Sequence, residues 1–170
     1  MQHYDALILD LDGVLYLGRE AVPHAVEHLN RMADAGVRLT AATNNANRPA
    51  AEVAEHLREL GLRIDTPDVL TSAQAAAEFL ARVLPAGSPV LAVGGNGVAE
   101  NLEKVGLRVL RASSDLAHCD VVASEAKALM IGYGPLVAWF DLAAAQWAID
   151  RGARWIATNT DPSVPLPYGR

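Results

Sequence analysis

Two aspartates stand two residues apart near the start of this chain, in the segment Leu9-Asp10-Leu11-Asp12-Gly13. Side chains alternate along an extended backbone, so Asp10 and Asp12 are expected to project to the same side. One carboxylate can attack as a nucleophile while the other transfers protons, and a divalent cation can link the pair to an anionic substrate. The alternative is an acidic turn that ends a strand and stays solvated, which is the better explanation for an isolated Asp-x-Asp.

The residues around the two acids favour the chemical interpretation. Residues 6–9 form an almost unbroken apolar run, a pattern that predicts a strand buried on both faces, as in a parallel sheet. Gly13 then lets the backbone turn sharply without a steric penalty from Cβ. In open α/β sheets, ligands bind beyond the carboxyl ends of the strands, and this strand places both acids there.

A second polar loop, Thr43-Asn44-Asn45, follows a strand predicted over residues 37–42. A hydroxyl group and backbone N–H groups leading toward a helix can hold a phosphate, although Thr and Asn are also ordinary helix caps. Helices are predicted over residues 23–35 and 49–60, each followed by a glycine. Strand, helix, strand, helix is half of a doubly wound parallel sheet, and beside the two acids the phosphate interpretation is favoured.

Composition excludes several classes of protein. The chain has 170 residues, a net charge of −6 and no basic run, so we expect no nucleic-acid partner. The N-terminus leaves no room for a signal region and no window is long enough to span a membrane, so we expect a cytoplasmic protein without a membrane partner. The single cysteine, Cys119, is expected to be a buried structural thiol.

The second half of the chain predicts a further α/β unit. Gly94-Gly95-Asn96-Gly97 joins a strand to a helix, but its spacing does not fit a dinucleotide or P-loop motif, so we interpret it as a plain turn. Trp139, Phe140, Ala143 and Trp147 form a stripe that is expected to face the core, and His56, in the first half, is expected at the surface. Strands are expected at residues 89–93, 121–123, 129–131 and 154–158, and helices at 72–84, 97–105 and 136–151.

Several motifs together resemble one known family. Asp10 to Tyr16 (Asp-Leu-Asp-Gly-Val-Leu-Tyr) resembles the first motif of the haloacid dehalogenase superfamily of phosphohydrolases, and Leu39 to Asn45 resembles the second. Thr-Asn-Asn followed by Arg48 resembles subfamily IIA, the NagD-like and 4-nitrophenylphosphatase-like enzymes. The resemblance continues through residues 70–74, 94–95 and 157–162, and so spans nearly the whole chain.

The resemblance implies a fold and a division into domains. The fold is α/β, with a partial Rossmann-like doubly wound parallel core sheet and an inserted α/β cap domain. Residues 1–66 would form the N-terminal half of the core, and residues 67–170 a C2-type cap with the start of the return to the core. The resemblance leaves the oligomeric state open, with a homodimer as one alternative.

The resemblance also implies a magnesium-dependent phosphatase that acts on a small phosphate monoester. Asp10 would attack phosphorus to form an aspartyl-phosphate, and Asp12 would serve as acid and then base. Both would bind Mg²⁺, Asp12 through its backbone carbonyl. The residues that would hold the phosphate or orient the substrate or the cap are Thr43, Asn44, Asn45 and Arg48.

Substrate identity is only weakly constrained. The relatives suggest glycerol phosphate, phosphoglycolate, a nucleoside monophosphate or 4-nitrophenyl phosphate. Glycerol phosphate is favoured because Gly132-Tyr133-Gly134-Pro135 and the tryptophan after it resemble actinobacterial members. This loop would reach the leaving group of the substrate, although a Gly/Pro turn that leads into a helix explains it as well.

Two elements of the superfamily pattern do not match this sequence: a lysine that braces the nucleophile, and an acidic pair that completes the metal site. Lys104 and Lys127 both fall in the cap-like stretch. Two like charges about 4 Å apart repel by about 4 kcal/mol at an effective dielectric of about 20, so a phosphate beside Asp10 needs such compensation.

The alternatives are a longer hydrolase, a second chain that supplies these groups, or a catalytically incomplete binding or regulatory protein. Without further strands, the first strand would also lie at a sheet edge.

Overall fold

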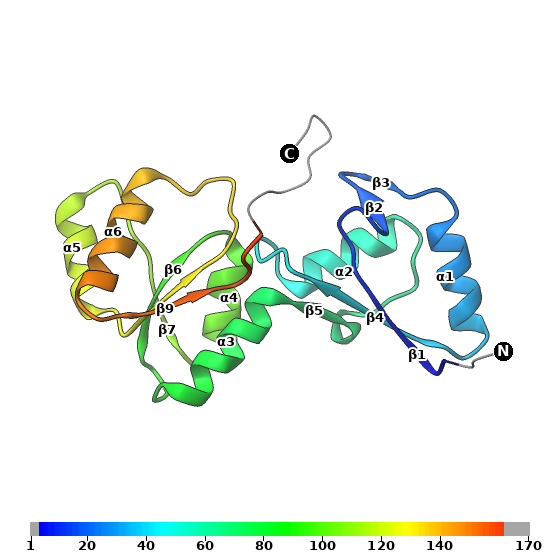
Figure 1. Ribbon diagram of the computed structural model, residues 1–170, viewed down its shortest axis with the longest axis horizontal. Helices are drawn as coiled ribbons and strands as arrows, with labels where there is room; N and C mark the ends of the chain where they lie inside the picture. Colours follow the sequence, from blue (N-terminus) through cyan, green and yellow to red (C-terminus); the bar gives the residue numbers. More distant parts are fainter. Residues whose placement is uncertain (1–3, 162–170) are drawn as a thin grey trace. The chain divides into compact units, whose positions relative to one another are not determined.

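The computed structural model describes residues 4–161 (Figure 1). Within this range the chain folds as two compact units, with residues 4–43, 50–71 and 161 in the first unit and residues 44–49 and 72–160 in the second. The backbone therefore passes between the units four times, after residues 43, 49, 71 and 160. No helix in residues 4–161 combines the length and apolar character needed to cross a membrane.

The first unit is built on a three-stranded parallel sheet. Its strands are β1 (Ala6–Leu9), β4 (Arg38–Thr43) and β5 (Val69–Thr71), in the order β1-β4-β5. The helices α1 (Ala25–Asp34) and α2 (Ala50–Glu59) connect these strands (Figure 1). A two-stranded antiparallel hairpin, β2 (Tyr16–Leu17) with β3 (Glu20–Ala21), follows β1, and a short 3-10 helix, η1 (Thr66–Asp68), precedes β5.

One face of this sheet carries the core of the first unit. Leu39 and Ala41 alternate along β4 and are both buried, while the intervening Thr40 is only half-buried. The helix α2 covers them with Val53 and Leu57, which lie four residues apart on one helical face. The apolar face of α2 therefore packs on the apolar face of β4, as the spacing of these residues in the sequence predicts.

The prediction that the first strand is buried on both faces is wrong for the described residues. Leu7 and Leu9 pack toward the core, but Ile8 is 78% exposed. The reason is that β1 is an edge strand of this sheet and both helices pack on the face that Leu7 and Leu9 share. The position of β1 at the edge of the sheet agrees with the expectation that the first strand lies at an edge when no further strands are present.

The second unit is a four-stranded parallel sheet in the order β7-β6-β8-β9. Along β6, Val90 and Ala92 belong to one apolar cluster and Leu91 and Val93 to another, so this strand is buried on both faces. The helices α3 and α4 pack against the first cluster and α5 and α6 against the second. The elements are α3 (Ser72–Val83), β6 (Pro89–Val93), α4 (Asn96–Lys104), β7 (Arg108–Leu110), α5 (Leu116–Glu125), β8 (Ala128–Ile131), α6 (Trp139–Asp150) and β9 (Arg154–Ala157).

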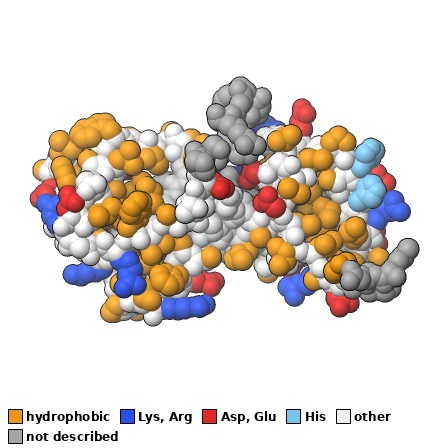
Figure 2. All heavy atoms as spheres, in the orientation of Figure 1, with side chains coloured by type: hydrophobic (Ala, Val, Ile, Leu, Met, Phe, Trp, Pro, Cys, Tyr) orange, Lys and Arg blue, Asp and Glu red, His pale blue; other side chains and the backbone are white. Residues whose placement is uncertain are grey.

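Two predictions for the second unit are wrong. Residues 121–123 are not a strand but part of α5, where Cys119, Val122 and Ala123 share a buried helical face. In α6 the fully buried residues are alanines such as Ala144 and Ala148; of the predicted stripe, Phe140 and Trp147 pack against the core as expected, but Trp139 is 64% exposed. Apolar side chains consequently gather on the surface over α5 and α6 (Figure 2). The burial of Cys119 is as expected.

The α/β class with parallel sheets is confirmed. The extents of the two units differ from the predicted domain ranges at residues 44–49, 67–71 and 161. Residues 67–71 group with the first unit because β5 pairs with β4, and residues 44–49 group with the second unit. The identification of residues 1–66 as half of a core domain and residues 67–170 as a cap stays a prediction.

Candidate active site

The two acids occupy a tightly bonded turn at the carboxyl end of β1. Asp10 directly follows β1 and is exposed, while Asp12 is half-buried. Between them, the side chain of Leu11 is fully buried, and its carbonyl accepts hydrogen bonds from the amides of residues 14, 15 and 16 at 2.9–3.3 Å. The Gly13 amide closes the turn on the Tyr16 carbonyl at 2.9 Å, with Gly13 at φ 84°. The backbone that carries both acids is therefore held in place before any ligand binds.

Tyr16, which closes this turn, is buried and contacts a histidine that was predicted to lie at the surface. The rings of Tyr16 and His56 meet edge to face, with centroids 5.0 Å apart. The His56 side chain is only 14% exposed, with Nδ1 3.7 Å from Glu59 Oε2 and a buried Nε2 that has no hydrogen-bond partner in the described part of the chain. The surface prediction is therefore wrong, and a signal was available, because position 56 lies three residues after the buried Val53 on the same helix.

Thr43 lies at the same edge of the first unit's sheet as the two acids. It is the last residue of β4, it is 6% exposed, and its Cα pairs with that of Thr71 in β5. Because Leu9, the last residue of β1, pairs with Ala41 in parallel register, Thr43 lies two residues beyond the end of β1, beside the segment that carries the acids, and neighbouring strands lie about 5 Å apart. The structure thus brings Asp10, Asp12 and Thr43 to one edge, as predicted.

The remaining three predicted residues, Asn44, Asn45 and Arg48, belong to the second unit. The Asn44 carbonyl accepts hydrogen bonds from Ser72 Oγ at 2.7 Å and Asn159 Nδ2 at 2.8 Å. The Asn45 side-chain oxygen accepts a hydrogen bond from the Asn47 amide at 3.0 Å. The six predicted residues therefore form two sets of three, one in each unit, and the chain passes from one set to the other at the bond between residues 43 and 44.

The Gly-rich segments of the second unit connect strands to helices, and they also pack closely against another loop. Gly95 and Gly97 lie against the backbone of residues 46–48, and Gly132 lies against the Ala46 side chain. Tyr133 is 37% exposed, and its carbonyl accepts a hydrogen bond from the Gly95 amide at 3.2 Å. That residues 132–135 reach a substrate stays a prediction.

The chemistry of the two acids suits a hard divalent cation. In the described residues no group of three or more His, Cys, Asp or Glu side chains gathers as a metal site. Mg²⁺ in proteins is usually held by one or two carboxylates together with water and substrate phosphate oxygens. Asp10 and Asp12 match that smaller requirement, with oxygen donors on a turn whose backbone is already fixed.

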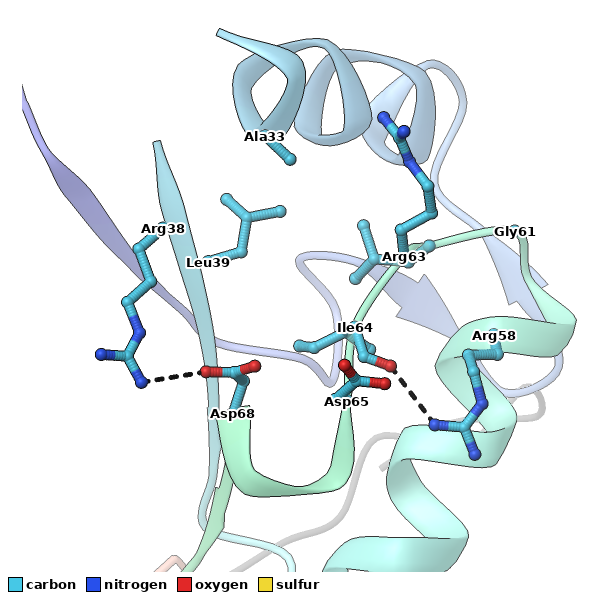
Figure 3. Close-up of a pocket in the computed structure, with 10 residues that line it drawn as sticks. Ala33, Arg38, Leu39, Arg58, Gly61, Arg63, Ile64, Asp65 and Asp68 are labelled. Atoms are coloured by element: carbon cyan, nitrogen blue, oxygen red, sulfur yellow. Dashed lines mark hydrogen bonds and ion pairs between the residues drawn. The ribbon is translucent and has the colours of Figure 1, made fainter. Parts of the chain in front are cut away.

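A hollow of about 590 Å³ lies at the opposite end of the first unit's sheet and contains none of the predicted site residues (Figure 3). Arg38, at the start of β4, pairs with Asp68 at 3.1 Å, and Arg58 donates to the Ile64 carbonyl at 3.3 Å. Arg63, also at this hollow, pairs with Asp34 at 2.6 Å. These guanidinium groups are already held by groups of the protein, and the hollow lies at the amino end of β4, away from the acids.

Comparison with known proteins identifies the family. Residues 7–108 match the family model described as haloacid dehalogenase-like hydrolase, which is more than half of the chain. The chain therefore belongs to this family of hydrolases. Its expected place beside the NagD-like enzymes is supported by NagD from E. coli K-12, which has 29% sequence identity and a TM-score of 0.75 over 94% of this chain and 58% of that one.

Two further relatives are named phosphatases. A D-glycerol 3-phosphate phosphatase of Mycobacterium tuberculosis is 40% identical over 99% of this chain and 44% of its own length. The crystal structure of glycerol phosphate phosphatase from that organism, in complex with magnesium, matches with 40% identity and a TM-score of 0.83 over 98% of this chain and 47% of that one. An acid sugar phosphatase of Staphylococcus epidermidis is 31% identical over 99% of this chain and 61% of its own length. The chain thus spans about half the length of the curated relatives it matches.

Proposed function

We propose that this chain carries the nucleophile and the acid/base of a magnesium-dependent phosphatase for small phosphate monoesters. The observation that carries the proposal is the fixed turn at the carboxyl end of β1, which presents Asp10 and Asp12 at the same sheet edge as Thr43. Membership of the hydrolase family and the phosphatase names of the relatives support it.

In the first step, a carboxylate oxygen of Asp10 attacks phosphorus and the bond from phosphorus to the leaving oxygen breaks. Asp12 donates a proton to that oxygen, so the alcohol leaves neutral and an aspartyl-phosphate remains on Asp10. The exposure of Asp10 gives an incoming phosphate access to its carboxylate.

In the second step, Asp12, now deprotonated, accepts a proton from water as the water oxygen attacks phosphorus. The bond from phosphorus to Asp10 breaks, inorganic phosphate is released and both carboxyl groups return to their starting forms. Asp12 is half-buried in the same bonded turn that follows Asp10, so the proposal has one fixed piece of backbone carry both groups through both steps.

Charge compensation comes from the remaining groups of the site. The Thr43 hydroxyl and Asn44 would hold phosphoryl oxygens, while Asn45 and Arg48 would orient the substrate. Bound through Asp10 and Asp12, Mg²⁺ would supply positive charge that offsets repulsion between a carboxylate and a phosphate dianion. Magnesium in the crystal structure of the M. tuberculosis relative supports this cofactor.

For the substrate, we favour glycerol phosphate, because the relative at 40% identity is named a D-glycerol 3-phosphate phosphatase. A sugar phosphate is the rival suggested by the acid sugar phosphatase. A second candidate function, a binding or regulatory protein without turnover, is favoured by one observation. The described residues hold only two acids at the site and no third metal ligand.

The test is phosphate release by the protein at its full natural length, with and without magnesium, across glycerol phosphate, phosphoglycolate, a nucleoside monophosphate, a sugar phosphate and 4-nitrophenyl phosphate. We expect magnesium-dependent release for at least one ester and none from an Asp10→Asn variant of unchanged thermal stability. Retained turnover in Asp10→Asn would remove Asp10 from the role of nucleophile. Binding of esters without release by the unmodified protein would favour the second candidate.

A further inference from the structure

The segment Asn44–Pro49 follows the last strand residue before the second unit and is packed into that unit like a core element. Ala46 is 0% exposed and belongs to the same apolar cluster as Val98 and Met130. The Asn47 carbonyl accepts a hydrogen bond from the Gly97 amide, in the first turn of α4, at 3.0 Å. An ordinary surface loop would not bury a side chain or accept a hydrogen bond from the first turn of a helix. This segment is therefore packed more tightly than a connecting loop.

Three glycines make room for this segment. A Cβ atom at Gly97 would lie 2.5 Å from the Ala46 carbonyl oxygen and 2.7 Å from that of Arg48, and one at Gly132 would lie 2.7 Å from Ala46 Cβ. A Cβ atom at Gly95 would collide with Asn47. None of the three glycines has φ in the left-handed region, so space, not backbone conformation, is what requires glycine here.

The start of the segment is fixed by a second set of contacts. The Asn44 carbonyl accepts hydrogen bonds from both Ser72 and Asn159. Ser72 is the first residue after the chain re-enters the second unit, and Asn159 stands two residues before Asp161, where the chain has left it. Three passages of the backbone are therefore joined at one carbonyl group.

We propose that Gly97, Gly132, Ser72 and Asn159 are positioning residues for the phosphate-binding loop. They hold Asn44–Pro49 as a fixed part of the second unit and thereby set the directions of the Asn44 and Asn45 side chains. This inference rests on the proposed function for its catalytic consequence, but the seating of the segment stands on the contacts alone. In this proposal the glycines after β6 make room for the backbone of residues 44–49 and do not bind a nucleotide.

The first test compares Gly97→Ala with Gly106→Ala in the protein at its full natural length. Gly106 follows the same helix, has φ 78°, and has no atom within 4 Å of the place that a Cβ would take, so alanine there strains the backbone without touching the segment. We expect amide hydrogen exchange of residues 44–48 to accelerate about tenfold in Gly97→Ala, because a hydrogen bond and its packing are lost, and to stay within about twofold in Gly106→Ala. Equal exchange in both variants would overturn the proposal.

The second test uses the milder double variant Ser72→Ala/Asn159→Ala, which removes both donors to the Asn44 carbonyl. We expect the inhibition constant of inorganic phosphate and the KM of the best ester to rise at least about tenfold, because a small misplacement of a binding group is costly. Ser72→Thr, which keeps the hydroxyl, should restore both values in the Asn159→Ala background toward those of Asn159→Ala alone. Faster exchange without any change in phosphate inhibition or KM would refute the positioning role.

The two proposals fail in different ways. If the unmodified protein releases no phosphate from any ester, the proposed function fails, and hydrogen exchange in the Gly97 and Gly106 variants still decides whether the segment is seated as described. If the unmodified protein is active and exchange does not respond to Gly97→Ala, the seating fails while the phosphatase assignment stands.

Discussion

Replacing His56 by phenylalanine should stabilise the protein at pH 8. The buried Nε2 of His56 has no hydrogen-bond partner in residues 4–161, and such a buried unsatisfied group costs roughly 1–3 kcal/mol. Phenylalanine removes this nitrogen and keeps the edge-to-face contact with Tyr16, whose centroid lies 5.0 Å away. The contact with Glu59, at 3.7 Å and with Glu59 71% exposed, contributes little because the carboxylate is largely solvated.

The opposing effect is the larger ring, since overpacking in a core costs about 1–3 kcal/mol. The side chain of His56 is 14% exposed and therefore not fully enclosed, which reduces the cost of the added volume. We therefore expect a net gain of about 1 kcal/mol, which for a domain of this size raises Tm by roughly 2–4 °C. The measurement is thermal unfolding followed by circular dichroism, with urea unfolding to confirm the free energy.

Two matched variants make the result interpretable. His28→Phe, at an exposed position on α1 where Nδ1 lies 2.7 Å from the His24 carbonyl, should not raise Tm. Glu59→Gln should leave Tm within about 1 °C at pH 8, which shows that the ion pair is not the cause. A fall of more than about 2 °C in His56→Phe, with both controls unchanged, would mean that Nε2 has a stabilising partner and that this reasoning is wrong.

Three other predictions concern the site and the core. Asp12→Ala should lower kcat by about 10²-fold or more if Asp12 is the acid and base, and a phosphate-release assay showing less than a tenfold loss would exclude that role. A chelator should stop phosphate release and added magnesium should restore it, as the carboxylate and phosphate oxygens require a hard cation; unchanged turnover after dialysis against chelator would contradict the metal proposal. Leu57→Ala, at a fully buried position, should cost about 2–5 kcal/mol in urea unfolding, whereas Leu142→Ala, at a position that is 52% exposed, should cost less than about 1 kcal/mol, and equal losses would refute the core assignment.

The two central strands of the second unit, β6 and β8, could be predicted because their side chains are apolar on both faces, whereas β7 (Arg108–Leu110) was not predicted. In β6 every residue from Val90 to Val93 is buried, and a continuous apolar run is the pattern of such a strand. The same apolar run in β1 led to a wrong prediction. An apolar run shows that a strand can be buried on both faces, but not whether other elements cover both faces, and Ile8 remains exposed. Residues 121–123 misled for a related reason: two adjacent valines favour a strand locally, but Cys119, Val122 and Ala123 already had helical spacing.

The polar residues of the site could be predicted from their place after apolar strands, since parallel strands end at a common edge. The residues that fix them could not. The position of His56, three residues after the buried Val53, indicates a place near the core, but nothing in its residue type indicates that its ring packs on Tyr16. Gly97 and Gly132 resemble turn residues in sequence, because a glycine needed for space and a glycine needed for its conformation are the same letter.

The Thr-Asn-Asn loop is one sequence motif that is divided between the two structural units. As a motif, residues 43–45 are one phosphate-binding element. In the structure, Thr43 is held by β-sheet pairing in the first unit, and Asn44 by two side-chain hydrogen bonds in the second. The two neighbours are thus fixed by independent sets of contacts, so substitutions at Ser72 or Asn159 should alter phosphate binding without altering the strand that carries Thr43. The local stability of β4, measured by hydrogen exchange of its amides, should accordingly be the same in Ser72→Ala/Asn159→Ala as in the unmodified protein. If this double variant weakened phosphate binding and also lost protection in β4, Thr43 and Asn44 would be held by one shared set of contacts.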